Sequence, residues 1–235
     1  MGLQTARMTT VRVLAAHDLV AARFPREPSQ QAPRARAVGA AIDSSLSQLS
    51  HESSLGRRPT LSAMQRFGAE RLEELLDEVE EPPSPEVRAR MLEEILGSLR
   101  AFRSSELMGL PRPRSRLVLV AERAGYFAQP DFWDRRARFF EMKSFRAIPP
   151  PPDILLQLQL FQLAFPGAAG TLVCIDRHAA PVSTSSWTVP PLQDLEASSL
   201  LAYAHSKATE SGEEKVLEYI DHPIVRYGLP PAPTA

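Results

Sequence analysis

The chain has 235 residues, enough for one sizeable domain, and its formal net charge is −1. That balance excludes a protein that coats nucleic acid through bulk positive charge, but not one with a local basic groove beside acidic metal ligands. No apolar run approaches the roughly 20 residues that cross a bilayer, so no membrane contact is expected. The only cysteine, Cys174, excludes an intramolecular disulfide and a cluster of cysteine metal ligands. It fits a reducing compartment, and the expected location is the cytoplasm, or the mitochondrion or nucleus of a eukaryote.

The first half of the chain is predicted to be helical. Val11–Ala22 and Ala35–Leu49 are expected to form helices, the second because small and apolar residues recur at helical spacing. Leu61–Glu80 is strongly amphipathic, and a cluster of prolines ends it. Pro85 is suited to open the next helix, which runs to about Phe102. The last two helices are predicted to form a hairpin.

The periodicity then changes to that of strands. Arg116–Ala121 is a short, nearly continuous apolar run, which is typical of a buried strand. Gly125–Trp133 and Arg138–Phe145 are two further predicted strands, joined by a charged hairpin turn over Asp134–Arg136. Ile154–Phe165 is a densely apolar predicted helix.

The last third of the chain is expected to complete the sheet and to end in helices. Thr171–Ile175 is a predicted strand, and Val182–Val189 is a predicted strand at the edge of the sheet. Leu192–Lys207 and Glu213–Tyr219 are predicted helices. Proline-rich residues 229–235 are predicted to be a mobile tail.

These elements predict an α/β fold with a mixed central β-sheet flanked by helices, in the order helix-β-β-β-helix-β, with an added helical hairpin. Residues 1–235 are expected to form a single domain. Its parts are a core of about 36–56 and 112–190, a helical insertion of about 60–105, C-terminal helices over 192–220 and the tail over 229–235.

The chemically informative segment is Gln129–Phe145. Side chains alternate along a strand, so Glu141 and Lys143 share one face, about 7 Å apart, while Met142 points to the other. Charges in an otherwise apolar strand are costly unless they are paired or bind a metal. Asp131 lies at the end of the preceding predicted strand, and a tight hairpin would bring it beside Glu141. Two close carboxylates repel each other unless a cation lies between them, and Mg²⁺ suits such an oxygen-rich site.

The pattern formed by Pro130-Asp131, Glu141 ten positions after Asp131, and Lys143 resembles the motif of the PD-(D/E)XK nuclease superfamily. Two further segments are similar to its RecB-like branch. Residues 157–161, from Gln157 to Phe161, resemble its QxxxY motif, and residues 39–43, which end at Asp43, resemble its GxxxH motif. The resemblance spans roughly residues 36–176. It implies a restriction-endonuclease-like core without an iron–sulfur cluster, because the single cysteine cannot supply four ligands.

The resemblance also implies a function. The expected activity is metal-dependent hydrolysis of DNA phosphodiester bonds in repair, recombination or processing, with DNA as the partner; protein partners stay open. The cofactor is expected to be Mg²⁺ or Mn²⁺. The expected catalytic residues are Asp131, Glu141, Lys143 and Gln157. The expected metal ligands are Asp43, Asp131, Glu141 and Met142.

Alternatives remain open at this point. Asp43 stands where the branch has histidine, and Phe161 stands where it has tyrosine. Because of these two differences, the alternative that the protein is a catalytically inactive module that binds DNA or a protein partner stays open. An unrelated α/β binding protein, in which the trio is accidental, is a third possibility. Several arginines are candidates for a phosphate-binding groove, and the sequence favours none of them: Arg57, Arg58, Arg112, Arg114, Arg135, Arg136 and Arg138.

Overall fold

The computed structural model describes residues 9–25, 32–55, 57, 60–77, 81–105, 107, 109–134, 136–179, 181–217 and 223–227. Within those ranges the chain forms six helices and nine strands, which confirms the α/β class. In chain order they are β1 (Thr9–Ala15), α1 (Ala16–Arg23), α2 (Ala32–Ser54), α3 (Leu61–Asp77), α4 (Pro85–Arg103), β2 (Arg116–Ala121), β3 (Ala124–Ala128), β4 (Phe132–Asp134), β5 (Arg138–Lys143), α5 (Pro152–Ala164), β6 (Ala169–Asp176), β7 (Ser183–Thr188), α6 (Asp194–Ser211), β8 (Glu213–Leu217) and β9 (Ile224–Arg226).

The strands form two mixed sheets rather than one central sheet. Sheet A has the order β8-β1-β3-β2-β9, and sheet B has the order β4-β5-β6-β7. In sheet B, β4 and β5 form the predicted antiparallel hairpin, whereas β5 and β6 are parallel and are connected through α5. The predicted edge strand is β7, which pairs with β6 at the border of sheet B.

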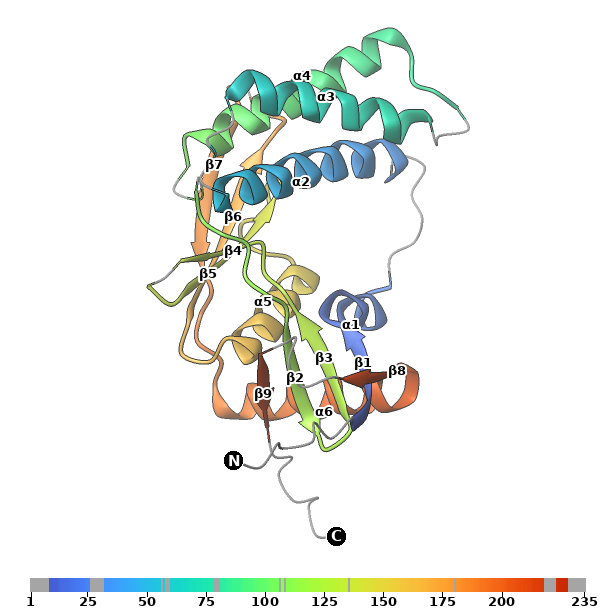
Figure 1. Cartoon of the computed structure of the whole chain (residues 1–235), viewed down its shortest axis with the longest axis vertical. Helices are drawn as coiled ribbons and strands as arrows, with labels where there is room; N and C mark the ends of the chain where they lie inside the picture. The colour runs from blue at the N-terminus through green and yellow to red at the C-terminus, as the bar shows by residue number, and fades with distance from the viewer. Residues whose placement is uncertain are drawn as a thin grey trace, which may run out of the picture.

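Helices cover the sheets in layers, and Figure 1 shows α2, α3 and α4 stacked at one end of the molecule and α5 between the two sheets. One hydrophobic core joins α2, α3 and α4 to the face of sheet B that carries Phe140, Met142 and Val173. A second core joins the opposite face of sheet B, with Phe139 and Leu172, to α5, α1, α6 and sheet A. The inner strands β5 and β6 of sheet B are therefore buried on both faces, whereas the edge strand β7 is mostly exposed, and polar side chains on β5 and β6 require partners.

The predicted hairpin of helices is formed by α3 and α4. They approach closely at Gly68, where an added Cβ would lie 2.9 Å from Ile95 Cγ2. Among the described residues, no helix is long and apolar enough to span a membrane.

Two predicted helices are wrong in part or in whole. The helix predicted over Val11–Ala22 begins only at Ala16, because residues 9–15 form β1, which pairs in parallel with β3. The helix predicted over Glu213–Tyr219 is instead strand β8 up to Leu217, and it pairs antiparallel with β1. In both segments, pairing with a distant strand overrides the local propensity. The predicted tail over 229–235 and residues 218–222 lie outside the described residues.

The strand predicted over Gly125–Trp133 is interrupted, and this correction positions the candidate site. β3 ends at Ala128 in sheet A, and β4 begins at Phe132 in sheet B. Pro130 has no backbone N–H and cannot donate to a strand ladder, so the chain leaves one sheet here and enters the other. Asp131 lies in this crossing, immediately before β4.

Candidate functional site

Glu141 and Lys143 form a buried ion pair on β5. Lys143 Nζ lies 2.7 Å from Glu141 Oε1, and the side chains of Glu141 and Lys143 are 5% and 21% exposed. The alternation predicted from the sequence is present, because Phe139 belongs to the core on the α5 side while Phe140 and Met142 belong to the core under α2–α4. The two charges therefore lie on the face of sheet B that α5 covers.

Asp131 lies at the open edge of β5, beyond the end of β4. Its Oδ2 accepts a hydrogen bond of 2.8 Å from the backbone N–H of Met142. β4 pairs with β5 only as far as Phe140, so the carboxylate satisfies a ladder donor that the neighbouring strand does not reach. This bond fixes Asp131 beside Glu141, in the arrangement expected from the hairpin.

Met142 contributes to the site through its backbone. Its side chain is buried in the core under α2–α4. In an antiparallel ladder the N–H and C=O of one residue point to the same neighbour, so the Met142 carbonyl faces the edge where Asp131 lies. A metal-ligand role for Met142 is therefore open only to its carbonyl oxygen.

Asp43 reaches the site from α2. That helix passes over the end of β5, where a Cβ added to Gly39 would lie 3.7 Å from Ser144 Oγ. One turn further along α2, Asp43 lines a small pocket together with Asp131 and Arg112. Asp43 keeps access to solvent in this pocket and does not lie apart from the other acids.

The cluster carries more negative than positive charge, with Asp43, Asp131 and Glu141 balanced only by Lys143 and Arg112. Burial and then the charge of Asp131 raise the pKa of Glu141 to about 8. Loss of hydration and then the charge of Asp131 raise the pKa of Asp43 to about 6. Although burial acts in the opposite direction, the charges of Glu141 and Asp131 hold the pKa of Lys143 above its ordinary value. The metal-free cluster therefore retains protons that ordinary carboxylates would release.

Gln157 lies on α5, over the same face of β5. Phe161 of this helix packs edge-on against Phe139, with the ring centroids 6.2 Å apart. Because α5 is the crossover between parallel strands, it runs back along β5, and a residue one turn before Phe161 lies further along β5, toward Glu141. Gln157 is half-buried there, but no hydrogen bond joins it to Asp131, Glu141 or Lys143 in the described part of the chain.

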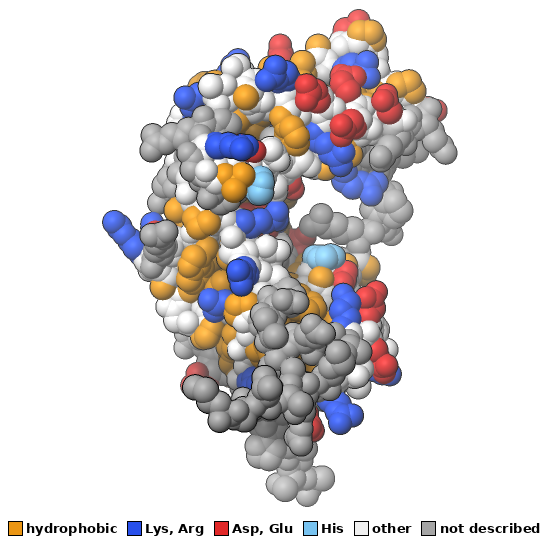
Figure 2. Space-filling model, in the orientation of Figure 1, with side chains coloured by type: hydrophobic (Ala, Val, Ile, Leu, Met, Phe, Trp, Pro, Cys, Tyr) orange, Lys and Arg blue, Asp and Glu red, His pale blue; other side chains and the backbone are white. Residues whose placement is uncertain are grey.

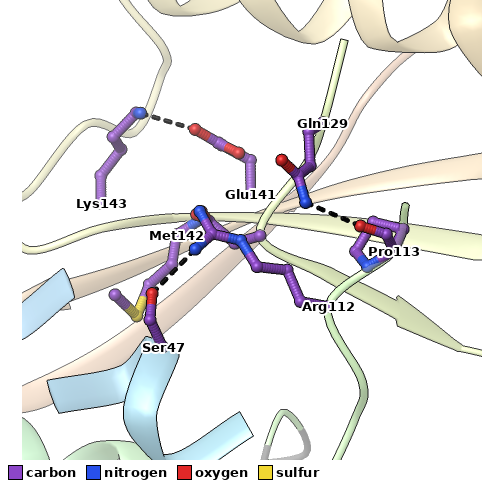
Figure 3. A network of polar contacts seen from close by, with 8 residues as sticks. Ser47, Arg112, Pro113, Gln129, Glu141, Met142 and Lys143 are labelled. Atoms are coloured by element: carbon purple, nitrogen blue, oxygen red, sulfur yellow. Dashed lines mark hydrogen bonds and ion pairs between the residues drawn. The ribbon is translucent and has the colours of Figure 1, made fainter. Parts of the chain in front are cut away.

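The structure places one of the candidate arginines, Arg112, beside the acids and adds Ser47, which the sequence did not suggest. Arg112 Nη1 donates a hydrogen bond of 2.8 Å to Ser47 Oγ on α2, as Figure 3 shows. Arg112 Nη2 lies 3.9 Å from Asp131 Oδ1. Two features of the sequence could have indicated these residues. Arg112 stands between two prolines, and Ser47 follows Asp43 by one helical turn.

The donor set suits a hard divalent cation. Mg²⁺ is commonly held by one or two carboxylates and retains several waters. The pKa values of Glu141 and Asp43 are raised first by burial and then by the charge of Asp131, and a cation would neutralise that charge. Asp131, Glu141 and the Met142 carbonyl are the groups that would hold it. Across the residues that the structure describes, no three His, Cys, Asp or Glu side chains are gathered so that they could hold a metal ion. Asp43 is thus near the site without completing a group of three carboxylate ligands.

Comparisons with known proteins found a distant similarity to a solved structure. No family model matches the chain, and no curated protein matches it. An alkaline exonuclease from Laribacter hongkongensis is 19% identical in sequence, and the match covers 84% of this chain and 90% of that one with a TM-score of 0.34.

The raised pKa values predict how the stability of the metal-free protein depends on pH. Asp43 and Glu141 bind protons more tightly in the folded state than in the unfolded state, so their contribution to stability is fully present near pH 4 and is lost as the pH rises through about 6, for Asp43, and about 8, for Glu141. We expect a loss on the order of 2 kcal/mol between pH 5 and pH 9, a decrease in Tm of roughly 5 °C.

Thermal unfolding followed by circular dichroism in EDTA measures this loss. Glu141→Gln is the control, because a neutral amide removes the larger of the two titrations and should flatten the profile. A wild-type Tm that is constant or rises from pH 5 to pH 9 would contradict the prediction.

Proposed function

We propose that this protein is a metal-dependent deoxyribonuclease that hydrolyses DNA phosphodiester bonds in repair, recombination or processing. The observation that carries the proposal is the buried Glu141–Lys143 pair on β5, with Asp131 hydrogen-bonded to the adjoining backbone at the open strand edge. DNA as the substrate follows from the resemblance of this pattern to the PD-(D/E)XK nucleases. Magnesium or manganese is the proposed cofactor.

Each residue has a definite task in this proposal. Asp131, Glu141 and the Met142 carbonyl present oxygen donors at one strand edge, and Asp43 adds negative charge from α2. A divalent cation held by these donors would acidify a water and neutralise charge on the phosphate. Lys143 keeps its proton beside Glu141, so its ammonium is available to orient the attacking water or to donate to phosphate oxygens as charge develops on them. Gln157 is proposed to act on the same face from α5.

The burial of the Glu141–Lys143 pair supports a chemical role for it over a purely structural one. A buried ion pair contributes little net stability, because the loss of hydration offsets the attraction between the charges. Here burial, and then the neighbouring carboxylate of Asp131, raise the pKa of Glu141, so its ionised form is unfavourable for folding alone. Perturbed titratable groups of this kind concentrate at functional sites.

A cleavage assay tests the proposal. Labelled single-stranded and double-stranded DNA, linear and circular, would be incubated with the purified protein in Mg²⁺, Mn²⁺ or EDTA. We expect cleavage in Mg²⁺ or Mn²⁺ and none in EDTA. The comparison of linear with circular DNA distinguishes exonuclease from endonuclease action. Absence of metal-dependent cleavage on every form of DNA would reject the enzyme and leave an inactive module that binds DNA or a protein partner.

A further inference from the structure

We propose that Arg112 holds a phosphate of the bound nucleic-acid strand beside the acidic cluster, and that Ser47 is the positioning residue that directs its guanidinium. The inference deepens the proposed function by assigning a substrate contact outside the Asp131–Glu141–Lys143 pattern. It rests on nucleic acid being the ligand of this site.

Hydrogen bonds join the residues on either side of Arg112 to residues on either side of Asp131. The Pro111 carbonyl accepts a hydrogen bond of 2.9 Å from the N–H of Trp133, and the Pro113 carbonyl accepts one of 2.8 Å from Gln129 Nε2. Gln129 and Trp133 are the residues two positions before and after Asp131. The flanking prolines also restrict the backbone around Arg112. Arg112 and Asp131 are therefore held at a constant separation by two bonds that involve neither of their side chains.

The guanidinium is fixed at one end and open at the other. Ser47 Oγ accepts from Nη1 at 2.8 Å, whereas Nη2 is 3.9 Å from Asp131 Oδ1, which is too long for a hydrogen bond. The Arg112 side chain is 45% exposed. A guanidinium has five N–H donors, and the described contacts use few of them. An anion arriving from solvent would therefore find oriented donors.

The surroundings of the Arg112 guanidinium favour phosphate as that anion. Arg112, Asp43 and Asp131 line a pocket of about 60 Å³, room for phosphate oxygens but not for a whole nucleotide. Three carboxylates repel a nucleic-acid strand, and Lys143, 2.7 Å from Glu141, offsets only part of their charge. Arg112 offers a planar fork that matches the geometry of phosphate. Figure 2 shows a hollow between the part of the molecule that contains α2 and the part that contains α1.

The alternative role for Arg112 is that of a simple counter-ion which holds Asp131 in place. That role would favour a direct hydrogen bond to Asp131, but Asp131 takes its hydrogen bond from the Met142 backbone instead. The two roles also differ in their dependence on salt. Only a residue that neutralises a phosphate changes the number of counterions released on binding.

The test measures DNA binding in Ca²⁺, with two short DNAs of unrelated sequence and fluorescence anisotropy over a range of salt concentrations. For Arg112→Gln we expect affinity to fall about tenfold for both sequences, and the slope of log K against log salt to decrease by about 1. Arg112→Lys should keep the slope near that of the wild type but bind severalfold more weakly, because it retains the charge and loses the fork. Ser47→Ala should keep the slope in this binding assay and, in the cleavage assay, raise KM severalfold.

Arg123→Gln is the matched control, since it removes the same charge from an exposed arginine in the turn between β2 and β3 of sheet A. An unchanged slope for Arg112→Gln, or an equal change for Arg123→Gln, would overturn the inference. If the wild type cleaves DNA but the salt slope of Arg112→Gln is unchanged, only the inference about Arg112 is rejected. If the salt slope of Arg112→Gln decreases but the wild type does not cleave DNA, only the proposed activity is rejected.

Discussion

Glu141→Gln is expected to reduce metal-dependent DNA cleavage by at least about a thousandfold, equivalent to roughly 4 kcal/mol in the activation free energy. Glutamine keeps the size of the side chain and can still accept a hydrogen bond from Lys143, so the packing around β5 should survive. What it removes is the formal charge that attracts a divalent cation to this strand edge. The loss should therefore appear in metal affinity as well as in turnover.

The same substitution is expected to raise the Tm of the metal-free protein at pH 8. Burial and the charge of Asp131 make an ionised Glu141 unfavourable, as its raised pKa of about 8 indicates, and glutamine removes this repulsion. Isothermal titration with Mg²⁺, circular dichroism and the cleavage assay measure metal affinity, stability and activity in turn. Glu210→Gln is the matched control, because Glu210 also pairs with a lysine at 2.7 Å but on the surface helix α6. Full activity of folded Glu141→Gln would remove Glu141 from the site.

Lys143→Ala is expected to lower kcat about a hundredfold while leaving KM nearly unchanged. An ammonium that assists charge development contributes more to the transition state than to the bound substrate, so its removal affects turnover before affinity. Glu141 and Asp131 remain in place in this variant, and metal binding should be close to that of the wild type. Removing a buried cation leaves Glu141 without its partner, but that carboxyl can take up a proton, so the fold should persist.

Steady-state kinetics and Mg²⁺ titration of Lys143→Ala test this division of roles. Lys207→Ala is the control, since Lys207 forms an ion pair of the same 2.7 Å length with Glu210 on α6. A rise in KM with kcat unchanged would show that Lys143 binds the substrate and does not act in the chemical step. An equal loss of Mg²⁺ affinity in Lys143→Ala and Glu141→Gln would show that Lys143 acts by organising the acids.

The sequence by itself determined the elements whose periodicity is local. The bounds of β2 are as predicted, and α4 differs from its prediction by one residue at its end, because a continuous apolar run and a proline at a helix start are signals carried within a few residues. The placement of Glu141 and Lys143 on one face, with Met142 on the other, also followed from the alternation of side chains along a strand. Asp131 lies close enough in sequence for its approach to β5 to be predicted.

The tertiary structure decided what depends on pairing between distant segments. β1 and β8 were predicted as helical because their partners lie far away in sequence and local propensity does not report them. The division into two sheets follows from the chain crossing at Pro130, which a continuous strand prediction did not show. Arg112 and Ser47 are 65 positions apart, and only the packing of α2 over the end of β5 brings them to the same acids. Seven arginines were equivalent in the sequence, and among those that the structure describes Arg112 is distinguished because its neighbouring carbonyls are bonded on both sides of Asp131.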